Sequence, residues 1–188
     1  MLSPALDEAG PGKTVAVVGD GAVGLLAALA ALAARQLGAE RIIAKSRHEA
    51  RQRLAVEYAA TDIVAERGAE GVARIKELTD GLDAHSVVEA VGTQESTTQA
   101  IHATRPGGHV GYVGVAHGVE LPGREPFYSH VHLHGGPAPV RRFLPELIDL
   151  IRRIDPGKVF DLTLPLDQAA DGCRAMDERR ATKVLLRV

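Results

Sequence analysis

The chain has 188 residues, enough for one substantial hydrophobic core and short for two full-sized domains. Hydrophobic residues make up 45%, charged residues 24%, and the net charge is -2, so charge gives no reason to expect nucleic acid or an anionic membrane as a partner. Cys173 is the single cysteine, so an intramolecular disulfide and a zinc site built from several cysteines are both excluded. This low cysteine content is typical of proteins in a reducing cytoplasm.

An apolar run at residues 22–34 is the one candidate targeting segment. It resembles the hydrophobic region of a signal peptide, but more acidic than basic side chains precede it and a glycine-rich turn interrupts it. It is also shorter than the roughly 20 residues that span a bilayer. We therefore interpret the run as a helix packed against a sheet and expect a cytoplasmic protein with no membrane partner.

Residues 1–12 show no clear period and are predicted to be a lead-in segment, so the expected domain covers residues 13–188. Beyond them, short β-branched runs alternate with helical stretches. Strands are predicted at residues 14–19, 41–45, 62–65, 86–90, 109–114, 130–133, 160–164 and 184–187. Helices are predicted at residues 22–37, 48–58, 70–79, 95–104, 140–154 and 168–180, the last one capped by Asp167.

The alternation of strand and helix predicts parallel strands with crossover helices on both faces of the sheet. The turn residues agree with this order, because Gly38 and Gly81 each follow a predicted helix and Pro106 begins the turn into the fifth strand. The sequence therefore predicts an α/β protein with a doubly wound parallel sheet, the Rossmann fold, in a single domain.

The first predicted strand leads into the first predicted helix through a turn that reads GDGAVG from Gly19. In this position a G-x-G-x-x-G pattern is typical of a dinucleotide site. Gly19 would permit the tight turn, Gly21 the approach of backbone amides to a diphosphate, and Gly24 close packing of the helix. Ala22 and Val23 would open the helix, whose N-terminus attracts anions. The alternative is a tight turn that binds nothing.

The end of the second strand is where an acidic side chain normally accepts hydrogen bonds from the adenosine ribose. This chain has Lys45, Ser46 and Arg47 there, Arg51 one turn further on, and no acid. A hydroxyl and basic side chains can bind a 2'-phosphate, so the sequence favours NADP over NAD. The alternative is that Ser46 forms a capping box with Glu49 and that the basic residues are merely solvated.

Several further stretches are distinctive: LGAERII, ATDIVAERG, EAVGTQEST, TRPGGHVGYVGV, HLHGG, IDPGKVFDLTLPLDQA and ERRATKVLLRV. Together with the glycine-rich turn they cover most of residues 11–188, and PGG followed by YVGV is more specific than a general dinucleotide motif. In these features the chain resembles the cofactor-binding half of a zinc-type alcohol dehydrogenase of the medium-chain dehydrogenase/reductase family. The resemblance implies an oxidoreductase.

The resemblance also implies eight further residues along the cofactor: Val91, Gly92, Val113, Gly114, Val115, Leu133, His134 and Lys183. The first five would flank the nicotinamide and its ribose, because the carboxyl ends of parallel strands form the ligand crevice. Leu133 and His134 would lie along the carboxamide, and Lys183 would reach the pyrophosphate. For the valines, the alternative is plain packing in the core.

Members of this family hold their catalytic zinc in a separate β-rich domain, which the sequence leads us to expect is absent from this chain. Zinc catalysis needs about three protein ligands and an open position. We interpret Cys173 as a small structural residue. His130, His132 and His134 would follow one face of a strand at steps of about 6–7 Å, which is long for one zinc ion, so we interpret them as structural or cofactor-lining. We expect no catalytic residue, metal ligand or zinc here.

The leading hypothesis is a domain that binds a nicotinamide dinucleotide, NADP in preference to NAD, and that is catalytically incomplete without a zinc-binding domain. The alternative is a dinucleotide-binding module without turnover, either a redox sensor or an inert remnant. A weaker hypothesis is a reductase without zinc that uses Tyr112 or His134 as the proton donor. Relatives dimerise through sheet edges, which implies a homodimer through the region of residues 125–129.

Overall fold

The structure is a computed structural model that describes residues 10–28, 38–114, 116–121, 123–136, 140–152 and 155–188. Strands and helices alternate along the chain in the predicted order. The sequence pattern predicts one domain over residues 13–188, whereas the contacts divide the chain into two compact units, Met1–Arg141 and Arg142–Val188. Each unit is described by itself.

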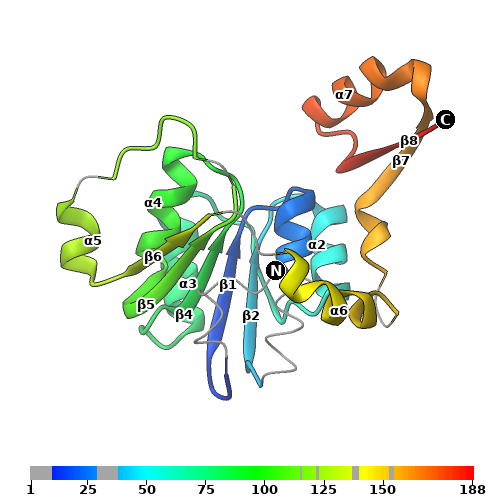
Figure 1. The fold of residues 1–188 in the computed structure, drawn as a ribbon. Helices are drawn as coiled ribbons and strands as arrows, with labels where there is room; N and C mark the ends of the chain where they lie inside the picture. Colours follow the sequence, from blue (N-terminus) through cyan, green and yellow to red (C-terminus); the bar gives the residue numbers. More distant parts are fainter. Residues whose placement is uncertain (1–9, 29–37, 115, 122, 137–139, 153–154) are drawn as a thin grey trace. The chain divides into compact units, whose positions relative to one another are not determined.

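A six-stranded sheet forms the first unit, and its strands lie in the order β3-β2-β1-β4-β5-β6. Figure 1 shows β2, β1, β4, β5 and β6 side by side in that order. Every neighbouring pair is parallel. The α/β fold predicted from the alternating pattern is therefore confirmed. The strands are β1 (Thr14–Val18), β2 (Arg41–Lys45), β3 (Asp62–Val64), β4 (Ala84–Glu89), β5 (Thr104–Tyr112) and β6 (His132–Gly135).

Helices follow most of these strands. The first helix is described at residues 22–28. The others are α2 (Glu49–Glu57), α3 (Gly68–Leu78), α4 (Gln94–His102) and the short α5 (Arg124–Ser129). The sequence analysis missed α5, because six residues with a proline among them show no helical period. Among the described residues, no helix has the length and apolar character that a membrane span needs.

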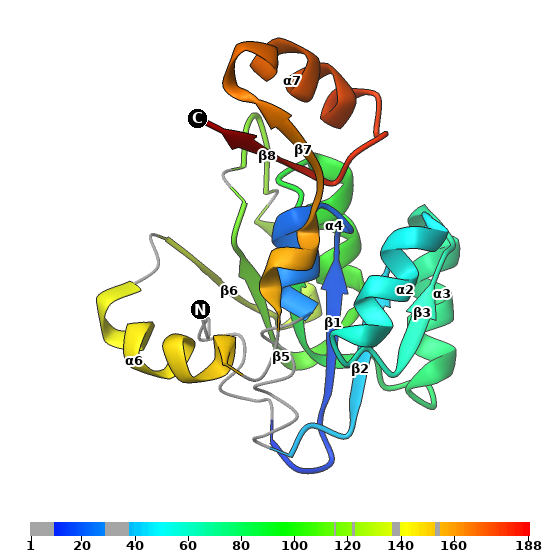
Figure 2. The same cartoon turned by 90° about the vertical axis from the view of Figure 1, so that its right-hand side faces the viewer.

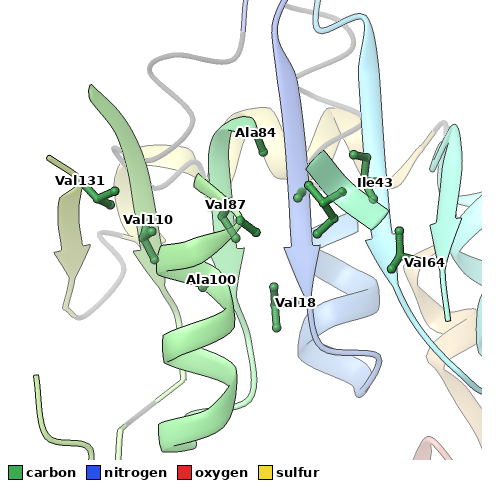
Figure 3. Close-up of a cluster of buried hydrophobic side chains, with 11 residues drawn as sticks. Val18, Ile43, Val64, Ala84, Val87, Ala100, Val110 and Val131 are labelled. Atoms are coloured by element: carbon green, nitrogen blue, oxygen red, sulfur yellow. The ribbon is translucent and has the colours of Figure 1, made fainter. Parts of the chain in front are cut away.

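Both faces of the sheet are buried, as a parallel sheet with crossover helices requires. On one face a hydrophobic cluster runs across the strands and takes in α3 and α4 (Figure 3). Its members are Ala16, Val18, Ile43, Val64, Ile75, Ala84, Val87, Ala100, Ala103, Val110 and Val131. Val15, Val17 and Ile42 alternate with these strand residues and are equally buried, so they point to the opposite face. The packed sheet therefore sets the positions from which the loops at the ends of its strands begin.

The second unit contains most of α6 (Val140–Ile151), followed by the 3-10 turns η2 (Pro156–Val159) and η3 (Leu166–Gln168), the strands β7 (Phe160–Pro165) and β8 (Lys183–Arg187), and α7 (Ala169–Asp177). Within the described part, β7 and β8 pair in parallel with each other and form their own sheet. Figure 2 shows α7 beside these two strands. The helix packs closely there, because a Cβ at Gly172 would lie 3.0 Å from Cγ1 of Val184.

The repeated strand-helix pattern had placed these last two strands in the same sheet as the others. Most of their side chains are exposed, so they lack the continuous burial of a strand covered on both faces. Two local predictions are also wrong in this unit. Asp167 does not cap α7, which follows Gln168 without a side-chain cap. Cys173 has no packing role, because it is exposed.

The core cluster gives a direct test of the fold. Ile43 has no exposed surface, so Ile43→Ala should lower the free energy of unfolding by about 2–5 kcal/mol, measured by urea denaturation followed by circular dichroism. Val56 on α2 is 54% exposed, and Val56→Ala should change the free energy of unfolding by less than about 0.5 kcal/mol. Equal losses in the two variants would contradict the described packing.

Candidate functional site

The order of the strands reverses between β1 and β4, where the chain leaves β3 and crosses to the other side of β1. In open α/β sheets, ligands bind outside the carboxyl ends of the strands at such a switch point. Gly19 follows β1, and Val91 and Gly92 follow β4, so the motif and two of the implied residues lie at the same place.

The glycine-rich turn is held by close contacts at its first and last glycines. Gly19 has a φ of 126°, and a Cβ there would lie 2.9 Å from Cγ2 of Val91. A Cβ at Gly24 would overlap the carbonyl oxygen of Gly19. Because neither position has room for a side chain, the turn between strand and helix is tight. The two glycines thus have the structural roles that the motif predicts.

Gly21, in the middle of the turn, differs from both. A Cβ at this position would have no atom within 4 Å among the described residues. Its carbonyl oxygen accepts a hydrogen bond from the backbone N–H of Leu25 at 2.9 Å, which closes the first turn of the helix. Ala22 is half-buried and Val23 is exposed. The open side of the turn therefore lies at Gly21 and the helix N-terminus, where a diphosphate can approach backbone amides.

A buried carboxylate shapes the neighbouring turn after β4. Oε1 of Glu89 accepts hydrogen bonds from the backbone N–H groups of Val91 at 2.8 Å and Gly92 at 2.9 Å. Gly92 has a φ of 84° and is buried, whereas the side chain of Val91 is half exposed. The sequence analysis missed Glu89, although an acid at the end of an apolar strand is unusual enough to have signalled it.

Of the implied residues after β5, Val113 and Gly114 lie against the end of β4 and the turn that follows it. A Cβ at Gly114 would lie 3.3 Å from the backbone nitrogen of Gly92, so the ends of β4 and β5 are in close contact. The backbone N–H of Val113 donates to the carbonyl of Glu89 at 2.9 Å. Val115, also predicted to line the cofactor, lies outside the described residues.

The last three implied residues are Leu133 and His134 in the first unit and Lys183 in the second. Leu133 in β6 packs against the core cluster, and His134 of the same strand lies two strands away from β4. Lys183 begins β8 in the second unit, where its backbone N–H donates to Oδ1 of Asp161 at 3.3 Å. Leu133 and His134 are therefore separated from β4 by β5, and the cofactor contact implied for Lys183 stays a prediction.

At the end of β2 the structure joins three polar side chains. The hydroxyl of Ser46 donates to Oδ2 of Asp20 at 3.0 Å, and Arg51 donates to Oδ1 of the same carboxylate at 3.2 Å. Ser46 is buried, and its carbonyl oxygen accepts a hydrogen bond from Nε2 of Gln52 at 2.8 Å. Asp20, which the sequence analysis did not include in the site, comes from the glycine-rich turn. Two of the predicted phosphate-binding side chains thus share one carboxylate.

The other two basic residues point in different directions. Arg47 is exposed, and its Nε donates to Nε2 of His48 at 3.4 Å. Nζ of Lys45 donates to the side-chain oxygen of Gln99 in α4. Burial of the Lys45 side chain lowers its pKa, because desolvation disfavours the ammonium, while Glu95 and Glu66 oppose that effect. Lys45 therefore lies on the opposite side of β2 from Ser46.

The capping-box alternative for Ser46 is wrong. α2 follows His48, which makes no side-chain cap hydrogen bond, and the Ser46 hydroxyl binds Asp20 instead. The Ser46 hydroxyl thus makes a tertiary hydrogen bond to the glycine-rich turn in place of a local one at the start of α2.

The predicted histidine strand gains a partner from β5. His134 lies against His109, with Nε2 and Nδ1 3.0 Å apart, and His132 stacks on His109 with ring centroids 4.7 Å apart. His130 lies before the strand in the left-handed backbone region. Within the described residues, no group of three or more His, Cys, Asp or Glu side chains is arranged to hold a metal ion.

Comparison with known proteins identifies a family and several relatives of this chain. A family model described as zinc-binding dehydrogenase matches residues 22–153. A probable zinc-binding alcohol dehydrogenase of Mycobacterium tuberculosis, Rv1895, is 39% identical over 166 residues, which are 86% of this chain and 41% of that protein. An NADP-dependent isopropanol dehydrogenase of Entamoeba histolytica is 35% identical over 153 residues, 79% of this chain and 40% of that protein.

Solved structures share the fold over nearly the whole chain. The alcohol dehydrogenase TADH from Thermus sp. ATN1 superimposes with a TM-score of 0.80 at 31% identity, over 98% of this chain and 55% of that one. An alcohol dehydrogenase from Thermotoga maritima gives a TM-score of 0.81 at 27% identity, over 97% of this chain and 52% of that one. The chain thus spans about two fifths to just over half of the length of these relatives.

Because Gly24 and Gly21 differ in the space around them, one added methyl group should destabilise the protein at the first position and have little effect at the second. Gly24→Ala should lower the free energy of unfolding by about 1–3 kcal/mol, because its Cβ overlaps the Gly19 carbonyl and the helix must move. Gly21→Ala should stay within about 0.5 kcal/mol of the unmodified chain, because its Cβ meets nothing. Urea denaturation measures both, and a stable Gly24→Ala variant would mean that the turn is looser than described.

Proposed function

Because the chain belongs to the zinc-binding dehydrogenase family, we propose that it binds a nicotinamide dinucleotide, NADP in preference to NAD. The observation that carries the proposal is the tight turn after β1, where Gly19 and Gly24 have no room for a side chain and the space beside Gly21 is open. It lies at the switch point of the sheet and at a helix N-terminus, so backbone amides and the helix dipole can both bind a diphosphate.

The preference for NADP is supported by the residues at the end of β2. Ser46 and Arg51 lie there beside the turn, and the exposed Arg47 adds a positive charge. Guanidinium groups bind phosphate through paired, charge-assisted hydrogen bonds, so these residues suit a 2'-phosphate on the adenosine ribose. The NADP-dependent isopropanol dehydrogenase of Entamoeba histolytica, 35% identical to this chain, is consistent with that choice.

For the whole reaction we propose oxidation of an alcohol with transfer of hydride to the bound cofactor. When bound, the dinucleotide supplies the hydride acceptor, while this chain's residues hold its diphosphate and adenosine ribose. We propose that turnover needs a zinc-binding catalytic domain in addition to these residues, and we assign no catalytic residue within them. A cytoplasmic location stays a prediction.

The alternative remains a binding module without turnover, and reconstitution separates the two. The chain is mixed with the isolated zinc-binding domain of a relative, Zn²⁺, NADP and an alcohol, and NADPH formation is followed. The dehydrogenase proposal expects turnover that depends on both polypeptides. The module alternative expects cofactor binding and no turnover.

We also propose a homodimer that forms at the β6 edge of the sheet. β6 is the last strand of the sheet order, and an uncovered edge strand favours pairing with another chain. Just before it in the sequence, α5 carries two exposed aromatic side chains, Phe127 and Tyr128, whose rings meet edge to face at 5.3 Å. Aromatic residues of this kind are enriched at protein interfaces.

The cofactor preference is tested by titrating the metal-stripped chain with NADPH and NADH and following the fluorescence of the nicotinamide. NADPH should bind more tightly. Arg47→Ala should weaken NADPH binding by about tenfold and NADH binding by less than about twofold, because only NADPH carries the 2'-phosphate. Arg53 is an exposed arginine of α2 that pairs with Glu49, and Arg53→Ala should change neither. Equal weakening of both cofactors by Arg47→Ala would refute its assignment.

The dimer is tested by sedimentation velocity over a range of concentrations. Phe127→Glu should raise the dimer dissociation constant by about tenfold or more, because a charge replaces an exposed aromatic side chain of the proposed interface. Leu82, between α3 and β4, is also exposed, and Leu82→Glu should leave the constant unchanged. An unmodified chain that stays monomeric at all concentrations would rule the proposal out.

A further inference from the structure

Asp20 lies between the first two glycines of the turn, and its carboxylate is bound at both oxygens. Oδ2 accepts from Ser46 at 3.0 Å and Oδ1 from Arg51 at 3.2 Å. The side chains of Arg51 and Asp20 are only 12% and 16% exposed, so this ion pair is shielded from solvent. The hydroxyl and guanidinium proposed for the 2'-phosphate are therefore already paired with an anion.

The register of the sheet explains how a residue of the first turn reaches the end of the second strand. Val18 is the parallel partner of Lys45, so the residues that follow each of them leave the sheet side by side. The Ser46 backbone is fixed as well, because its N–H donates to the carbonyl of Val64 at 3.0 Å and its own carbonyl accepts from Gln52. Asp20 thus meets a Ser46 whose position is set by β3 and α2.

This placement resolves a feature of the sequence. The second strand of a dinucleotide fold normally ends in an acid that accepts hydrogen bonds from the adenosine ribose hydroxyls. Here the strand ends at Lys45 and is followed by Ser46, and the carboxylate beside that position comes from the glycine-rich turn. Asp20 therefore places a negative charge beside the end of β2, although β2 itself does not end in an acid.

We propose that Asp20 is a specificity-determining residue that reduces the preference for NADP over NAD. The proposal rests on the proposed function, since it concerns the adenosine end of the same cofactor. A 2'-phosphate entering beside Ser46 and Arg51 meets the Asp20 charge and must displace it from both partners. A free 2'-hydroxyl has no negative charge and can donate a hydrogen bond to the same carboxylate. Asp20 therefore opposes the effect of Arg47, and the two set the final ratio of affinities.

The test replaces the charge without changing the shape, in the full chain. Asp20→Asn keeps the size of the side chain and removes its charge, and dissociation constants for NADPH and NADH are measured by nicotinamide fluorescence. The ratio of the NADH constant to the NADPH constant should rise by about tenfold over the unmodified chain. The ratio is the readout, because a purely structural loss would weaken both cofactors together.

Two further variants complete the experiment. Asp62→Asn is the matched control, because Asp62 also carries an arginine partner, Arg41 at 3.4 Å, but lies at the start of β3. It removes the same charge and should leave the ratio unchanged. Asp20→Ser is the second test variant, in case the asparagine does not fold. Thermal unfolding by circular dichroism reports whether each variant is folded.

The outcomes separate this proposal from the proposed function. If the unmodified chain binds neither NADPH nor NADH, the proposed function fails, and the role of Asp20 fails with it. If it binds, but a folded Asp20 variant leaves the ratio unchanged or shifts it toward NADH, the role of Asp20 alone is refuted. Failure of both Asp20 variants to fold would also refute it, by making Asp20 a structural link between the two turns.

Discussion

The turn after β1 has no room for a side chain at Gly19 or Gly24, and the rest of the site depends on this steric constraint. The Gly19 carbonyl occupies the space where residue 24 would carry a side chain, and Val91 closes the space beside Gly19 itself. The first helix can therefore start directly against the end of the strand, with its N-terminus at the switch point of the sheet. The same contacts bring the turn after β4 against the turn after β1, so the two loops lie side by side at the switch point.

Charge organises the site around that turn. Two carboxylates lie at this site. Glu89, buried at the end of β4, binds the backbone amides of its own turn, and Asp20, within the glycine-rich turn, binds side chains at the end of β2. One fixes the backbone conformation, and the other occupies the groups that would attract a phosphate. The packing of the site therefore follows from glycines, whereas the cofactor selectivity that we propose follows from a balance between one acid and several bases.

The sequence predicted what local patterns determine. The order of strands and helices and the position of the glycine-rich turn follow from hydrophobic periodicity and from turn residues, and the structure agrees with both. It could not predict the Asp20–Ser46 hydrogen bond, which joins residues 26 positions apart. The pairing of β7 with β8 depends on long-range contacts in the same way. The capping box proposed for Ser46 failed because a tertiary partner outcompeted a local one.

The end of β2 carries a constraint on chain length. Neighbouring residues of a strand point to opposite faces, so Lys45 reaches Gln99 in α4, while Ser46 reaches Asp20 in the glycine-rich turn. Gain or loss of one residue within this strand would exchange the two faces, placing an ammonium beside Asp20 and a short hydroxyl where the long lysine stem now fills space. Substitutions can change either residue separately, but a shift in spacing changes both at once. Homologues that keep this arrangement should therefore vary in composition along β2 while conserving its number of residues.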